Sequence, residues 1–151
     1  IGVTVAEAKA YMEAYFATFP GVRQYMDSVV AQAKEQGYVE TLFHRRRELP
    51  EIRSSNFNMR SFGERAAMNM PLQGTAADII KIAMIRVHDK FKTLQLKSKL
   101  ILQVHDELIV DVVKEELETV KVIAKETMEN TVQIGVKLAC DVEYGETWDL
   151  K

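Results

Sequence analysis

The sequence is poor in cysteine, in proline and in long apolar runs. A single cysteine, Cys140, stands among 151 residues, which excludes a disulfide framework and a structural zinc site built on thiolates. Such cysteine usage suits a reducing cytoplasm, where we expect the protein to act. No apolar run approaches the roughly 20 residues that span a bilayer, so the sequence predicts neither a membrane segment nor a membrane partner.

The beginning of the chain also lacks the features of a leader sequence. The first residue is Ile1, and no basic stretch followed by an apolar stretch comes after it. We therefore expect no signal peptide and interpret the chain as a piece of a longer protein. Apolar residues make up 47% of the sequence, which argues against disorder and allows one domain, or a large part of one, with a real core.

Charge is distributed unevenly along the chain. The net charge of −2 by itself argues against nucleic acid as a partner. Between His44 and Arg65, however, there are six arginines and three glutamates, whereas the rest of the chain carries 14 basic and 19 acidic residues. A basic segment on an otherwise acidic chain is a candidate phosphate-binding face. An ordinary solvated loop is the alternative interpretation.

The N-terminal third predicts two helices and a hairpin. Thr4 and Glu7 have the spacing of a capping box, so a helix is expected to begin at Val5. Pro20 suits the first turn of a second helix, and Gly37 is a good end for it. Residues 38–43 then predict a strand of a hairpin whose tip is basic (residues 44–47), and residues 50–57 predict a loop.

Further along, a helix is expected over residues 58–69, and Pro71 is expected to break or kink it. A second helical stretch follows from about Gly74 to Leu94. Two apolar runs, Lys99–Val104 and Glu107–Val113, are separated by only two residues, which is hairpin spacing.

An amphipathic helix over residues 115–130 and an alternating strand over residues 136–144 complete the pattern. The predicted fold class is α+β. An antiparallel sheet, formed by the hairpin and a third strand, is covered by helices on one side and preceded by helices.

The predicted hairpin carries an unusual tip. His105 and Asp106 form it and Glu107 follows, where most hairpin tips hold Gly, Asn or Asp. Apolar strands hold the tip firmly, which suits a metal site or an acid/base site. A solvent-facing polar turn is the alternative.

Because neighbouring residues on a strand point to opposite faces, Asp106 is the better metal ligand of the two carboxylates. Glu107 is then expected to lie to the side or to contact the ion through water, as Mg²⁺ keeps several waters. No second ligand segment is evident, since the other nearby acidic residues fit solvated strand positions: Asp111, Asp141 and Glu143.

A polar stripe precedes the proline. Arg65, Asn69 and Gln73 are spaced by four and lie on nearly the same face of a helix, among apolar neighbours. Arg suits phosphate, and the two amides can donate to the acceptors that every base pair presents in the minor groove. The stripe is therefore a candidate DNA-contacting surface that checks base-pair shape without reading sequence. A solvent-facing helix stripe is the alternative.

Several segments together resemble the family A DNA polymerases, in the family's order and over nearly the whole chain. They are FPGVRQYM (19–26), GYVETLFHRRRELPEI (37–52), NFNMRSFGERAAMNMPLQGTAADIIKIAMI (56–85), QVHDELIV (103–110) and VEYGETWD (142–149). The resemblance implies that residues 1–57 belong to the fingers side and residues 58–151 to the palm. It also implies that QVHDEL is the catalytic hairpin.

The same resemblance implies roles for these residues in two-metal transfer of a nucleotide from a dNTP to a primer 3′-OH. Asp106 would bind a catalytic Mg²⁺, Glu107 would be its acidic neighbour, and His105 would sit by the primer terminus. The polar stripe would touch the template–primer near the new base pair. The basic tip is a weaker candidate for backbone contact: Arg45, Arg46 and Arg47.

Two family motifs are missing from the sequence. A strand of the DYSQIELR type, which carries the other catalytic aspartate, is absent, and so is a fingers helix of the RRxxKxxxxGxxYG type, which grips the nucleotide. The chain is therefore expected to need the rest of the polymerase chain as its partner and to be inactive alone. A non-catalytic DNA-binding or interaction module that keeps the palm fold is the alternative.

Overall fold

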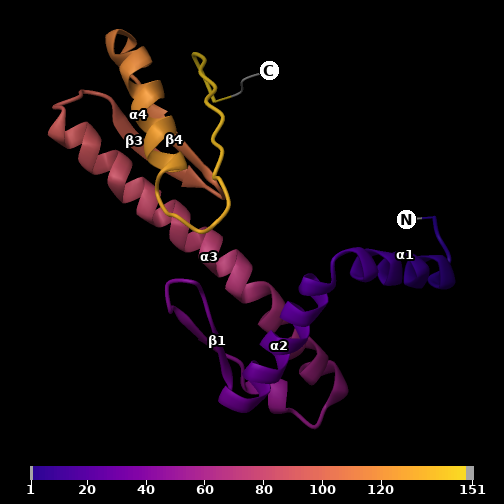
Figure 1. Cartoon of the computed structure of the whole chain (residues 1–151). Coiled ribbons are helices and arrows are strands. Elements are labelled where there is room, and N and C mark those ends of the chain that lie inside the picture. Colours follow the sequence, from indigo (N-terminus) through magenta and orange to yellow (C-terminus); the bar gives the residue numbers. More distant parts are fainter. Residues whose placement is uncertain (1, 149–151) are drawn as a thin grey trace. The chain divides into compact units, whose positions relative to one another are not determined.

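The computed structural model describes residues 2–148 and has the α+β composition that the sequence predicts. It divides into two compact units, an N-terminal unit (Ile1–Thr75) and a C-terminal unit (Ala76–Lys151). Each contains a small antiparallel hairpin (Figure 1). Each also has its own buried core. Within residues 2–148, no helix is long and apolar enough to cross a membrane.

The first two helices form as predicted. Helix α1 (Val5–Thr18) begins with a complete capping box, in which the Thr4 hydroxyl accepts from the Glu7 amide and the Glu7 carboxylate accepts from the Thr4 amide. Helix α2 (Pro20–Gln36) ends at Gly37, whose φ of 87° is left-handed. A glycine adopts this conformation without the steric cost that a side chain would bring, so it ends the helix well.

The first hairpin differs in detail from the prediction. Strand β1 (Tyr38–Glu40) pairs with β2 (Arg46–Glu48), so the turn spans residues 41–45. Two of the three arginines thus lie in the returning strand rather than at the tip. The buried Thr41 hydroxyl accepts hydrogen bonds from the amides of Phe43 and Arg45. These bonds complete the turn before Arg46, where β2 begins.

Residues 50–57 are not the simple loop that their polar composition predicts. Residues Pro50–Arg53 form the short 3₁₀ helix η1, and Ile52 within it is almost fully buried. The Arg53 guanidinium donates to the last carbonyls of α2, those of Lys34 and Glu35. These carbonyls have no partner within α2, so the arginine both satisfies them and anchors η1.

Helix α3 (Phe57–Thr93) does not break at Pro71, so the break that was predicted as the alternative to a kink is wrong. Its 37 residues run through the proline as one continuous ribbon (Figure 1). A proline inside a helix loses one backbone hydrogen bond and crowds the preceding turn, a cost of about 3 kcal/mol. Buried side chains on both sides of it, Ala67 and Met70 before and Ile80 after, supply packing that offsets this cost.

The core of the N-terminal unit is packed closely against α3. Apart from the half-buried Val30 and Ala66, its members are buried: Val29, Ala33, Val39, Leu49, Ile52, Ala67 and Met70. A Cβ atom added at Gly63 would lie 2.7 Å from the Ile52 backbone nitrogen. Only a glycine therefore lets η1 lie directly on the helix.

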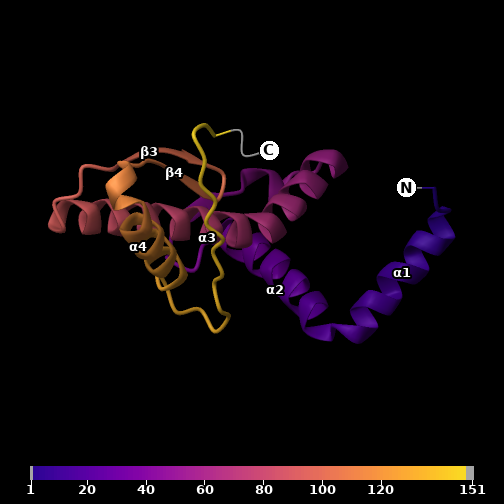
Figure 2. The same ribbon diagram turned by 90° about the horizontal axis from the view of Figure 1, so that it is seen from above.

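In the C-terminal unit, strands β3 (Lys99–Val104) and β4 (Glu107–Asp111) form the predicted hairpin. The short helix η2 (Lys114–Glu116) leads into α4 (Leu117–Glu129), which with the hairpin lies beside the C-terminal half of α3 (Figures 1 and 2). Val87, Phe91 and Val120 are the buried centre of this arrangement.

The third strand predicted over residues 136–144 does not form. Residues 132–148 contain no helix or strand, and neither β3 nor β4 pairs with them. The segment instead contacts α4: the Cys140 amide donates to Glu129, and Lys121 lies 4.6 Å from the Tyr144 ring centre. Alternation of apolar and polar residues favours a strand, but a strand also needs a neighbour that pairs with its backbone.

One carboxylate joins the start of the second hairpin to η2. Glu116 accepts hydrogen bonds from the amides of Lys97 and Ser98 and from the Ser98 hydroxyl, at 2.9, 2.9 and 2.6 Å. The same hydroxyl accepts the Val113 amide at 3.0 Å. These bonds to Glu116, that of the Lys97 amide foremost, hold the pKa of its carboxyl below the ordinary value of 4.5.

Replacing Glu116 with Ala is expected to destabilise the C-terminal unit in a pH-dependent way. Because folding lowers this pKa, the stabilisation is present above the unfolded pKa and is lost as pH falls through the folded one. Urea unfolding followed by circular dichroism should therefore show the gap between variant and wild type closing as the solution is acidified below pH 4.5. Glu118→Ala, at an exposed position of α4, is the control. A gap that stays constant with pH would contradict this account.

Candidate functional site

The tip of the second hairpin is a two-residue turn, as the sequence predicts. Val104 pairs with Glu107, so only His105 and Asp106 lie between the strands. His105 has a φ of 52°, and all three side chains from His105 to Glu107 are exposed. Behind the tip, Leu108 and Val110 pack against the core of the C-terminal unit. The tip is thus presented to solvent on an anchored support.

The carboxylates of this tip fit part of a metal site. Within residues 2–148, no group of three or more His, Cys, Asp or Glu side chains is arranged to hold an ion. Asp111 is exposed at the opposite end of the hairpin, and Asp141 and Glu143 are exposed in the irregular segment after α4. None of the three joins Asp106. A carboxylate exposed on a firm turn suits one coordination position of a divalent ion, and the other ligands would have to come from elsewhere.

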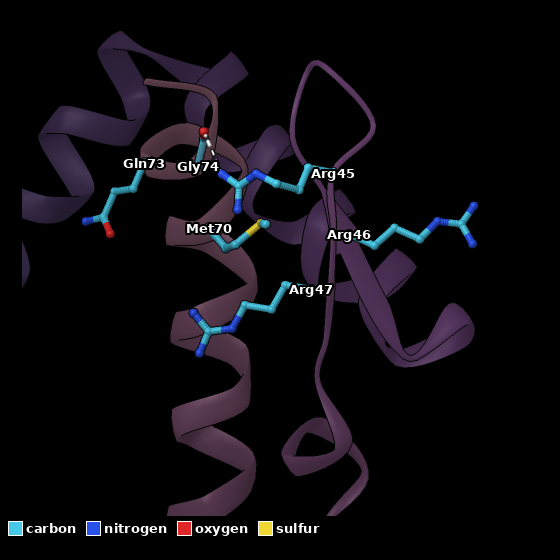
Figure 3. A pocket seen from close by; sticks show the side chains of 6 residues that line it. All are labelled: Arg45, Arg46, Arg47, Met70, Gln73 and Gly74. Atoms are coloured by element: carbon cyan, nitrogen blue, oxygen red, sulfur yellow. Dashed lines mark hydrogen bonds between the residues drawn. The ribbon is translucent and has the colours of Figure 1, made fainter. Parts of the chain in front are cut away.

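The polar stripe of α3 lies in the N-terminal unit. Arg65, Asn69 and Gln73 are all exposed on the helix. They line a shallow hollow of about 260 Å³ between α3 and strand β2, together with Arg47, Phe62, Ala66 and Met70. A neighbouring hollow of about 370 Å³ shares Arg47, Met70 and Gln73 and adds Arg45, Arg46 and Gly74 (Figure 3). We refer to the two together as the basic hollow.

The three consecutive arginines are not equivalent. Arg45 reaches the helix and donates from Nη2 to the Gly74 carbonyl at 3.0 Å. Arg46 points away from α3 (Figure 3), where it donates to Glu40 at 2.6 Å and lies 4.4 Å from the centre of the Tyr38 ring. Its hydrogen bond lowers the pKa of Glu40. Arg47 points toward α3 and lines both hollows.

The hairpin is held against α3 at close range, which explains why the arginines lie beside the stripe. The Thr75 hydroxyl accepts the Leu42 amide at 2.9 Å and donates to the Pro71 carbonyl. At Gly74, an added Cβ would lie 2.7 Å from a methyl group of Thr41. The hydroxyl and the missing side chain together let the turn of the hairpin lie on the helix.

The sequence indicated the stripe and the arginines separately but not that they share one hollow. Alternation along an extended chain was the available signal, since it places Arg45 and Arg47 on one side and Arg46 on the other. Nothing in the sequence indicated that Phe62 and Met70 line the hollow, because apolar residues on an amphipathic helix predict only packing.

Comparison with known proteins gives consistent matches over almost the whole chain. The chain matches the family described as DNA polymerase family A over residues 1–150. It is 53% identical over 148 residues to DNA polymerase I of Geobacillus stearothermophilus, 51% to that of Bacillus subtilis strain 168 and 49% to that of Lactococcus lactis subsp. lactis strain IL1403. Each match covers 98% of this chain and 17% of the relative.

A solved structure is similar in fold as well as in sequence. The POL domain of Pol1 from M. smegmatis, in complex with DNA primer-template and dNTP, matches with a TM-score of 0.95 and 47% identity. The match covers 98% of this chain and 26% of that one. On its sequence and its fold, the chain belongs to DNA polymerase family A.

Proposed function

We propose that this chain is the part of a bacterial DNA-directed DNA polymerase that carries one of its catalytic carboxylates. The reaction is template-directed transfer of a nucleotide from a dNTP to a primer 3′-OH, in DNA replication and repair in the bacterial cytoplasm. The observation that carries the proposal is the exposed His105-Asp106 turn on an anchored hairpin, in a chain whose relatives are DNA polymerases.

Asp106 is proposed to hold a divalent ion, Mg²⁺. Its position on a two-residue turn leaves the carboxylate open to an ion and to ligands from another segment. A bound Mg²⁺ supplies charge stabilisation for the attacking and leaving oxygens of phosphoryl transfer. Glu107 begins β4 and is proposed as the auxiliary acidic neighbour, and His105 as a contact of the primer terminus.

The basic hollow is proposed to bind the template–primer. Arg65 and Arg47 suit phosphate oxygens, and the amides of Asn69 and Gln73 suit the acceptors of the minor groove. Arg45 and Arg46 are weaker candidates, because Arg45 donates to Gly74 and Arg46 is held by Glu40. We also propose that residues 1–57 belong to the fingers side of the polymerase and residues 58–151 to its palm.

A second candidate function is a non-catalytic module that binds DNA or a protein through a retained palm fold. Such a module would not need to keep ionisable side chains at the tip of the hairpin. The intact His105-Asp106-Glu107 tip on an anchored support therefore favours the catalytic reading.

Replacing Asp106 with Ala in the parent polymerase is expected to reduce primer extension by several orders of magnitude and to leave template–primer binding largely unchanged. The reason is that the carboxylate holds an ion at the reacting atoms and does not contact the duplex. Single-turnover extension and fluorescence anisotropy measure the two effects. Asp111→Ala, at the far end of the same hairpin, is the matched control, and near-normal turnover of the Asp106 variant would sink the assignment.

The isolated 151-residue chain is expected to show no Mg²⁺-dependent primer extension. Within the described residues, the tip carboxylates are not joined by further ligands, so no complete ion site is available. The assay compares the purified chain with the parent polymerase on the same template. Extension above background by the chain alone would show that its own residues suffice.

Arg47 and Arg46 provide a matched pair for the basic hollow. Arg47→Ala in the parent polymerase is expected to weaken template–primer binding several-fold and to lower the slope of log affinity against log salt by about one. Arg46→Ala should change the affinity and the salt slope much less, because its guanidinium is engaged on the other side of the strand. Anisotropy titrations at several salt concentrations decide this, and equal effects of the two substitutions would argue against a site in the hollow.

A further inference from the structure

The strand that leads to the catalytic tip contains an irregularity. Between the pairs Leu100–Val110 and Leu102–Ile109, β3 has one residue more than β4. The extra residue is Ile101, which is exposed. This is a β-bulge, a feature that re-aims the side chains following it.

The bulge determines which side of the hairpin Gln103 occupies. Residues directly opposite each other in an antiparallel pair share a face, and Gln103 lies opposite Leu108. Leu108 packs against the core, so the half-buried Gln103 is on the core side, whereas Leu102 is 47% exposed on the other side. If Ile101 were paired regularly instead of bulged, strict alternation from Leu100 would place Leu102 inward and Gln103 outward.

A polar side chain on the core side of a strand needs a hydrogen-bond partner. Gln103 finds it at the tip itself: its Nε2 donates to the His105 carbonyl at 2.6 Å. The residue that it holds is in an unfavourable conformation. His105 has a φ of 52° at the first position of a two-residue turn, a place where glycine is usual when φ is positive.

We propose that Gln103 is a positioning residue for the polymerase reaction. Its amide group fixes the His105 carbonyl, keeps the turn in its left-handed conformation and so sets the direction in which the next residue, Asp106, presents its carboxylate. The bulge at Ile101 places the Gln103 side chain on the core side of the hairpin, from which its amide group reaches the His105 carbonyl. The proposal rests on the proposed function of Asp106, and it adds a residue that acts through the backbone of the turn and not through contact with substrate.

The test uses the parent polymerase with two substitutions that remove the donor, Gln103→Leu and Gln103→Glu. Leu keeps a similar size without polarity, and Glu keeps the shape and an acceptor but cannot donate at neutral pH. Gln133→Leu, at an exposed position after α4, is the control for the substitution itself. Amide hydrogen exchange of peptides that cover the tip measures the turn directly.

Both variants are expected to speed exchange at the tip and to raise the Mg²⁺ concentration for half-maximal extension by about threefold to tenfold, the loss of one hydrogen bond. The maximal rate should fall, while the KM for dNTP and the Kd for template–primer should stay within about twofold. The control should match wild type in every measurement.

Three results would overturn the proposal. Unchanged exchange at the tip would mean that the amide group does not hold the turn, and faster exchange with an unchanged Mg²⁺ requirement would mean that the bond is structural only. An unaltered Glu variant beside an impaired Leu variant would likewise exclude donation as the cause. If the wild-type parent extends no primer at all, the proposed function fails, and the exchange measurement still decides whether Gln103 holds the turn.

Discussion

The structure depends most on the burial of two separate apolar stretches along one helix. Ala67 and Met70 of α3 belong to the core of the N-terminal unit, and Val87 and Phe91 belong to that of the C-terminal unit. Each stretch is covered by elements that could not be stable alone, since a two-stranded hairpin is marginal in water. The helix therefore supports both candidate sites, because β1 and β2 lie beside its polar stripe and the hairpin of β3 and β4 lies beside its later turns.

Much of this arrangement could be predicted from local patterns. The Thr4 and Glu7 capping box, the left-handed Gly37 and the two-residue spacing of the second hairpin each depend on contacts within a few residues, and all three formed as predicted. The predictions that were wrong required distant information. Helix α3 continues through Pro71 because buried side chains on both sides of the proline stabilise it. Residues Pro50–Arg53 form a 3₁₀ helix against α3 because Gly63 leaves room for the backbone of Ile52. No local rule contains those contacts.

The candidate sites show the same limit. The spacing of Arg65, Asn69 and Gln73 indicated one face, and the structure adds that Arg47 joins this face whereas Arg46 is neutralised by Glu40 on the other. A run of three arginines thus divides into one that anchors the hairpin, one that is paired with Glu40 and one that points toward α3 and lines both hollows. Charge counted along the sequence overstates the charge that a site can offer, because part of it is already used in holding the fold together.

The second hairpin has a further consequence for the chain as a separate molecule. Within the described residues, β3 and β4 pair only with each other, so the outer edge of each strand presents unpaired amide and carbonyl groups. Ile101 and Leu102 expose large apolar side chains beside one of these edges. An open, apolar strand edge is a template for the addition of another strand. The edge that could accept a strand from another protein segment could equally accept one from a second copy of this chain.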